Sequence, residues 1–312
     1  MRSDVDLDRN LDHSEVISQA RSGFVPHRVL FQGLIRAMRK LIGLLIVGAL
    51  LSFGQLASAG PFEDGVAAYQ RGDYATALKL WRPLAVQRNA PAQFNLGVMY
   101  EHGQGIAQDH AEAVKWYRLS AEQGDAAAQN SLGLMYDKGQ GVPQDHAEAV
   151  KWYRKAAEQG NALVQIKLGL MYGLGLGVPQ DHAEAVKWFR LSAEQGRADA
   201  QNALGVMYRL GQGVAQDRRE ALKWFRLAAE QGDADAQNNL GAMYGDGQGV
   251  AQDYVRAHMW LNLAAASSSG DDAKNSTNNR NRLAAKMTPA QVERAQEMAR
   301  KCDASKFKDC GW

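Results

Sequence analysis

Tryptophan recurs through the middle of the chain at a constant interval. Trp116, Trp152, Trp188, Trp224 and Trp260 follow one another every 36 residues. A fixed period of this length indicates one repeated structural unit, and it suits two helices joined by a short turn. A single hairpin of that size is marginal in water, so its stability must come from stacking on other copies. The sequence therefore predicts an all-α fold, an α-solenoid of stacked helical hairpins with capping helices at its ends.

The first helix of each copy carries one apolar pattern. In the first copy it is formed by Ala92, Leu96 and Tyr100, which are four residues apart and so lie on one helical face. A glycine follows the leucine in all five copies, as Gly97 does here, although glycine in a helix costs about 1 kcal/mol relative to alanine. This recurrence predicts that another helix approaches closely at the glycine.

Two glycines and an acidic pair separate the first helix from the second. In the first copy they are Gly103 and Gly105, then Asp109 and Glu112. A phosphate-binding loop would need a preceding strand and a helix directly after it, and neither is predicted. We interpret the glycines as helix C-caps and turn residues. The aspartate is the expected N-cap of the second helix, with the glutamate reaching back as in a capping box.

The repeated polar residues do not form a catalytic or metal site. Identical carboxylate pairs spread along a solenoid cannot converge on one substrate atom. His110, His146 and His182 occupy equivalent places, but packed helices in adjacent repeats are about 10 Å apart, too far for shared coordination of a metal ion. We interpret them as solvent-exposed residues of a first helical turn and the tryptophans as core. No cofactor and no metal are expected, and the chain is not predicted to be an enzyme.

The segments outside the repeats divide the chain further. Tyr69 to Trp81 looks like a hairpin that closes the N-terminal end, whereas Thr288 and Pro289 begin a helix near the C-terminus. The Ser, Asn and Asp richness of residues 267–281 predicts a linker or loop. The predicted domains are an unstructured extension (1–37), a signal peptide (38–59), an N-terminal capping hairpin (60–88), five repeats (89–124, 125–160, 161–196, 197–232 and 233–268), and a linker with a C-terminal capping helix (269–312).

The signal peptide is predicted from three features in the expected order. Basic residues follow Met38, an uncharged apolar stretch runs from Leu41, and Ala57-Ser58-Ala59 forms a cleavage site before Gly60. Cleavage between Ala59 and Gly60 and translation from Met38 are expected, with a periplasmic or secreted protein as the result. A retained membrane anchor and a buried helix are the alternatives, although the apolar part is shorter than the about 20 residues of a membrane-spanning helix.

The charge of the predicted mature protein is balanced. The formal net charge is +2, but residues 60–312 hold 29 Lys and Arg against 29 Asp and Glu. A neutral body without a basic stripe offers little attraction to the phosphate backbone. Nucleic-acid binding is therefore not expected.

The repeated pattern resembles the Sel1-like repeat family, a branch of the tetratricopeptide-type solenoids. The resemblance rests on Ala-x3-Leu-Gly-x2-Tyr, Gly-x-Gly-Val, Asp, Ala-x2-Trp-Tyr/Phe and Ala-x2-Gly, and it covers residues 89–268. The chain departs from this pattern at Val164, which replaces alanine, at Ile106, which replaces valine, and at Leu261, which replaces the aromatic residue after the tryptophan. The resemblance implies a right-handed α-solenoid that acts as a scaffold or adaptor without shared catalytic residues. Cysteine-rich relatives are linked to β-lactams, but no repeat of this chain contains a cysteine.

Candidate partner-binding residues lie between the packing positions of the first helices, which line the concave surface in solenoids of this type. They vary among copies whose other positions do not, as expected of a surface that recognises a non-repeating partner, although drift on a solvated face gives the same pattern. Phe94, Ile166, Leu174 and Leu210 are the apolar members best suited to anchor a peptide. The three registers are Phe94, Asn130, Ile166, Asn202 and Asn238; Glu101, Asp137, Gly173, Arg209 and Gly245; and His102, Lys138, Leu174, Leu210 and Asp246.

Cys302 and Cys310 are the only cysteines. In an exported protein they are expected to form a disulfide, worth roughly 2 to 3 kcal/mol in the chain-entropy model. A zinc site would need two more ligands, and His258 is the only nearby candidate. Free thiols are expected if export fails.

Together these features favour an exported scaffold that binds a protein or peptide in the groove of the repeat array. An envelope hydrolase and a structural assembly subunit are the alternatives. The sequence defines neither the partner nor the oligomeric state.

Overall fold

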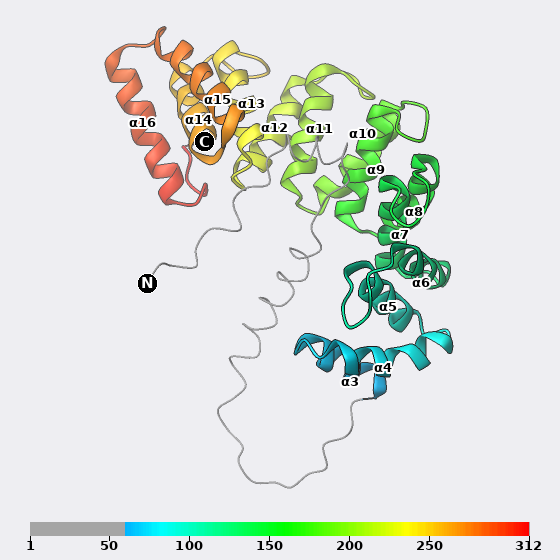
Figure 1. Cartoon of the computed structure of the whole chain (residues 1–312). Helices are drawn as coiled ribbons and strands as arrows, with labels where there is room; N and C mark the ends of the chain where they lie inside the picture. Colours follow the sequence, from blue (N-terminus) through cyan, green and yellow to red (C-terminus); the bar gives the residue numbers. More distant parts are fainter. Residues whose placement is uncertain (1–59, 312) are drawn as a thin grey trace, which may run out of the picture. The chain divides into compact units, whose positions relative to one another are not determined.

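The computed structural model describes residues 60–311, and throughout this range the regular elements are helices (Figure 1). The chain divides into two units, whose described parts are residues 60–152 and 153–311, and each is considered by itself below. The helices are α3 (Pro61–Gln70), α4 (Tyr74–Val86), α5 (Ala90–His102), α6 (His110–Glu122), α7 (Ala126–Lys138), α8 (His146–Glu158), α9 (Ala162–Leu174), α10 (His182–Glu194), α11 (Ala198–Leu210), α12 (Arg218–Ala229), α13 (Ala234–Asp246), α14 (Tyr254–Ser267), α15 (Gly270–Ala284) and α16 (Pro289–Ala304).

The helix ends follow the predicted signals, with one exception. The first helices end at a glycine in the left-handed conformation, as at Gly103 with φ 66°. The second helices begin at an aspartate whose side chain accepts backbone hydrogen bonds, as Asp109 does from Glu112 at 3.0 Å. The glutamate does not reach back to the N-cap as predicted. Glu112 instead pairs with Lys115, and Glu148, Glu184 and Glu220 pair in the same way, because a lysine stands one helical turn further on.

In repeats with an aromatic residue after the tryptophan, the recurring glycine of the first helix lies against that aromatic residue of the second helix. At Gly205, a Cβ atom would come within 2.7 Å of the Phe225 ring. Phe225 is fully buried. Close approach of two helices at this glycine was the prediction from the repeat pattern, and the structure confirms it.

Successive hairpins are joined by polar bonds between equivalent residues. In the second unit, the Arg190 guanidinium donates to the Tyr208 hydroxyl at 2.6 Å and lies over its ring. Gln231 Nε2 donates to Gln201 Oε1 at 2.8 Å. In the first unit, Arg118 donates to the Tyr136 hydroxyl in the same way. These bonds help to keep neighbouring hairpins in register, while apolar burial holds them together.

The N-terminal hairpin, α3 and α4, packs on the first repeat. Trp81 is buried in its core and donates through Nε1 to the carbonyl of Phe62 at 3.1 Å. The core of this region continues through Ala92, Leu96 and Met99 of α5. Residues 61–86 thus form a hairpin in the place predicted for the N-terminal cap.

The C-terminal region corrects one prediction. Most of the expected linker at 267–281 belongs to a helix, α15, which begins 36 residues after α13 and so keeps the period of the repeat. Its buried residues are Ser276 and Leu283, whereas α13 buries six. The polar composition is compatible with a helix because α15 lies at the end of the array, where little of its surface is covered.

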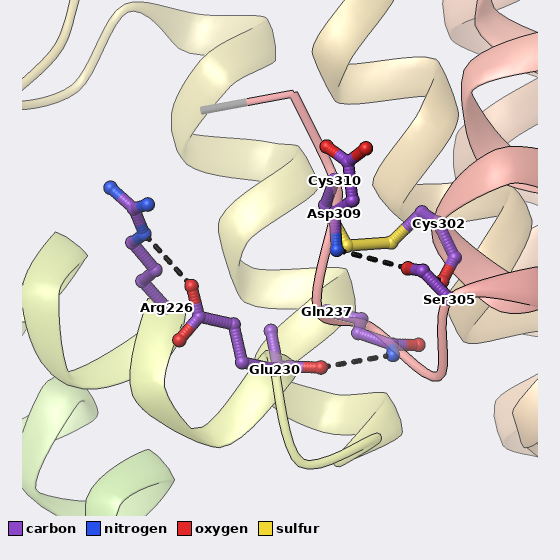
Figure 2. The surroundings of a disulfide bond; sticks show 8 residues. Arg226, Glu230, Gln237, Cys302, Ser305, Asp309 and Cys310 are labelled. Carbon is purple, nitrogen blue, oxygen red and sulfur yellow. Dashed lines mark hydrogen bonds and ion pairs between the residues drawn. A yellow bond between two sulfur atoms is a disulfide. The ribbon is translucent and has the colours of Figure 1, made fainter.

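The last helix, α16, packs against α14. It begins at Thr288, which forms a capping box with Gln291. A disulfide joins Cys302 to Cys310, both of which are buried. Figure 2 shows Ser305 next to this disulfide, where its hydroxyl accepts from the Asp309 amide at 2.9 Å. The chain then holds Phe307 against Gly232, and Arg256 donates to the carbonyl of Gly311 at 3.1 Å.

The predicted extension (1–37), the signal peptide (38–59) with Ala59, and Trp312 lie outside the described residues. Between residues 60 and 311, no helix is both long and apolar enough to cross a membrane. The same part of the chain has no cluster of three or more His, Cys, Asp or Glu residues suited to a metal ion.

Candidate functional site

The first predicted register of partner-binding residues packs inside the array. Ile166 and Asn202 are buried, and Asn202 accepts a hydrogen bond from Asn239 in the next first helix at 3.0 Å. Phe94 is half-buried, with its ring centroid 5.7 Å from that of Tyr117. Ile166 and Asn202 are therefore not open to a groove as predicted, because they lie where a first helix meets its neighbours, whereas Phe94 keeps part of its side chain exposed.

The other two members of this register are also half-buried. The Oδ1 atom of Asn130 is buried without a hydrogen-bond partner. Asn238 accepts from Asn279 of α15 at 3.3 Å. Both amides therefore lie against protein rather than in open solvent.

The second predicted register also turns toward the second helices. Glu101 is buried and accepts from the Tyr117 hydroxyl at 2.5 Å. Burial, followed by the charge of Glu101, raises the pKa of Tyr117 well above its ordinary value. Asp137 lies 2.7 Å from Nδ1 of His146. Arg209 is half-buried, and its Nε atom has no hydrogen-bond partner. Glu101 and Asp137 thus engage polar groups of the second helices and are not open to a ligand.

The third predicted register is the one that reaches the surface. Leu174 and Leu210 are 46% and 50% exposed, and His102 is exposed as well. Lys138 is half-buried, and burial lowers its pKa, whereas the charges of Glu101 and Asp137 act in the opposite direction. Leu174 and Leu210 are the last residues of α9 and α11, just before the C-cap glycines. Of the predicted residues, these two best meet the requirement for exposed apolar anchors.

The sequence interpretation missed the residues that extend this surface. Leu170 and Val206 are partly exposed and stand four residues before Leu174 and Leu210, so each pair shares one helical face. We call Leu170, Leu174, Val206 and Leu210 the apolar stripe. Leu170 and Val206 could have been found from the sequence, because each stands one helical turn before a predicted leucine.

The apolar stripe lies within the second unit, on two first helices that pack on the same second helix. Both α9 and α11 pack against α10, which fixes their order in the stack (Figure 1). Leu176, in the loop after α9, is half-exposed and stands where the other four repeats have glutamine. Charged side chains at the edge include Lys167, which lies 5.1 Å from the Tyr153 ring centroid, and the exposed Asp246.

This arrangement offers binding rather than chemistry. Four aliphatic side chains on adjacent helices can receive apolar side chains of a ligand, and the polar edge can orient it. No nucleophile and base lie together in the stripe, so the geometry supports recognition of a protein or peptide surface.

A family model and solved structures match this chain. The Sel1 repeat model matches residues 90–125, 126–161, 162–196, 198–233 and 234–269, about one residue later than the predicted boundaries. The chain is similar to a solved Sel1 repeat protein from Oxalobacter formigenes, with 34% identity and a TM-score of 0.68 over 77% of this chain and 99% of that one. It also matches a protective antigen of uropathogenic Escherichia coli with an SLR fold, with 26% identity and a TM-score of 0.32 over 79% of this chain and 85% of that one. A search of curated proteins gave no significant match.

Proposed function

The chain belongs to the Sel1 repeat family, and from this premise we propose that it is a scaffold that holds a protein or peptide partner on the apolar stripe. The observation that carries the proposal is the exposure of Leu174 and Leu210 at equivalent positions of consecutive repeats. Exposed leucines that recur in register on successive first helices mark a candidate interaction surface, whereas scattered ones need no explanation.

The spacing of the stripe favours an elongated ligand. Both α9 and α11 pack on α10, so the two helices that carry the stripe are held side by side at a fixed separation. A partner helix laid across α9 and α11 could therefore place apolar residues on both. Because the stripe is small, we expect a few anchors in the partner to supply most of the binding energy.

The test combines cross-linking with a matched pair of double variants. A photoreactive amino acid placed at position 174 or 210 should cross-link to a partner in cells of the source organism, and the same residue at position 119 should not. Leu174→Glu/Leu210→Glu should reduce recovery of that partner at least tenfold. Leu191→Glu/Leu227→Glu changes two leucines of similar exposure on the second helices and should leave recovery unchanged. Equal recovery with both double variants would exclude the stripe.

We also propose that the chain is exported. The support is the order of basic residues, apolar segment and small residues between Met38 and Gly60. The intact mass of protein from the periplasmic or culture fraction should correspond to a chain that begins at Gly60. A mass that includes residues 38–59 would instead indicate a retained anchor.

A further inference from the structure

The outer faces of α10 and α12 carry three kinds of side chain in the same axial order. Lys187, Leu191 and Glu194 follow one another along α10, and Lys223, Leu227 and Glu230 follow in α12. Spacings of four and three residues keep each trio on one helical face. Leu191 and Leu227 are 44% and 43% exposed, although they are large aliphatic residues. We call these six residues the leucine ledge.

The equivalent face of α14 shows that this surface can hold a helix. Met259 and Leu263 stand in the places of the ledge lysine and leucine, and both are buried. The helix α16 packs on α14, and its buried residues Ala299 and Cys302 belong to the same core cluster as Met259 and Leu263. The same position is thus covered in α14 and open in α10 and α12.

The difference in composition specifies what could cover the ledge. In α14 the lysine is replaced by methionine, so α16 needs no charged group there. In α10 and α12 a covering surface must place apolar groups over Leu191 and Leu227 and acceptors near Lys187 and Lys223. Each lysine already lies 2.6 or 2.7 Å from a glutamate of its own helix. An ammonium group has three donors, and both side chains are about 70% exposed, so a further carboxylate can be accommodated.

We propose that the leucine ledge binds the leucine ledge of a second copy of this chain. A two-fold axis through the row of leucines reverses the direction of the facing helices. It therefore sets the lysine end of one ledge over the glutamate end of the other. In this arrangement α10 faces α10 of the second copy and α12 faces α12, so Leu191 and Leu227 each meet the same leucine of the second copy, and Lys187 meets Glu194. Lys223 meets Glu230, which is also held by Arg226 at 3.1 Å.

The resulting dimer is weak and sensitive to salt. Two leucines and four charged residues per copy form a contact well below the about 800 Å² per partner of a standard interface. The cross-pairs are exposed to solvent, so screening weakens them as salt rises. The proposal does not depend on partner binding at the apolar stripe, because the two surfaces use different helices.

Sedimentation equilibrium of the full purified chain tests the proposal between about 1 µM and about 1 mM, the range in which weak transient interfaces dissociate. The wild-type chain should shift from monomer toward dimer over this range, and less so at high salt. Leu191→Glu/Leu227→Glu should remain monomeric. Leu174→Glu/Leu210→Glu, on the apolar stripe, should dimerise like the wild type. A wild-type chain that stays monomeric throughout would overturn the proposal.

A charge exchange tests the two-fold arrangement itself. Lys187→Glu/Lys223→Glu makes both ends of the ledge acidic, and Glu194→Lys/Glu230→Lys makes both ends basic. Each variant alone should lose dimerisation, because like charges then face one another. Mixed in equal amounts they should form heterodimers, because every acidic end meets a basic one. Thermal melts by circular dichroism establish that both variants fold. Failure of the folded pair to associate, or dimers formed by each alone, would refute this geometry.

Discussion

The helices α13 and α15 begin 36 residues apart, yet they are packed differently. α13 lies between α12 and α14, and its core is built around Leu240, which is fully buried. α15 packs on α14, has Ser276 in the place of that leucine, and is not paired with the helix that follows it. The spacing of the helices thus continues into α15, although the residue pattern of the repeat ends before it. A repeat needs its apolar pattern only where a neighbour covers both sides.

The largest expected effect tests whether positions 240 and 276, which are equivalent in the repeat, contribute differently to the free energy of unfolding. Leu240→Ala should lower the free energy of unfolding by about 3 to 5 kcal/mol, because it leaves a cavity in a closed core. Ser276→Ala should change it by less than about 1 kcal/mol, because little volume is lost. Urea unfolding followed by circular dichroism measures both. Similar losses in the two variants would mean that α15 is as deeply integrated as α13.

A second prediction sharpens the contrast between the covered and open outer faces. Met259→Lys introduces the residue that the other repeats carry at this position, but places its charge beneath α16. The expected loss is about 2 to 4 kcal/mol, because α16 can detach and so limit the cost of a buried charge. Hydrogen exchange at residues 289–304 should accelerate. Lys223→Met, the reciprocal change on α12, should leave this exchange unaltered, and equal acceleration in both variants would contradict the assignment.

The smallest expected effect concerns His258, which occupies a position that is valine or leucine in the other repeats. His258 is buried in α14, and burial and the charge of Arg280 lower its pKa below the ordinary 6.5. The unfolded chain therefore binds this proton more readily than the folded one. The associated stability is complete above pH 6.5 and is lost as the pH falls toward the lowered pKa.

The His258→Val variant isolates this contribution. Restoring valine should remove the acid-sensitive component, so the difference in melting temperature between the variant and the wild type should grow as the pH falls below 6.5. Thermal melts at a series of pH values measure it. A difference that is independent of pH would show that His258 affects packing alone.

The repeats could be predicted because each copy repeats the same physical requirement. The placement of Leu96, Gly97 and Trp116 follows from spacing alone, and the helix caps follow from Asp109 and Gly103. The binding surface was harder, because spacing shows that residues share a face but not which neighbour covers it. Ile166 and Glu101 varied like surface residues, yet an adjacent helix buries them.

The C-terminal region was predicted less well for a different reason. A polar helix such as α15 has no apolar pattern from which to infer it. The sequence does contain a sign of where α16 packs, because Met259 stands where the first four repeats have lysine. An apolar residue at an otherwise charged position indicates that something covers it, although not which segment does.

The contact between Phe307 and Gly232 ties the C-terminal segment to an earlier repeat. At Gly124 and Gly196 the equivalent corner is open, whereas at Gly232 it is covered by a ring that follows the last helix. The end of the chain is thereby fastened two hairpins back. Fraying from the C-terminus must release α16 and the terminal loop before the fifth repeat can separate from the fourth.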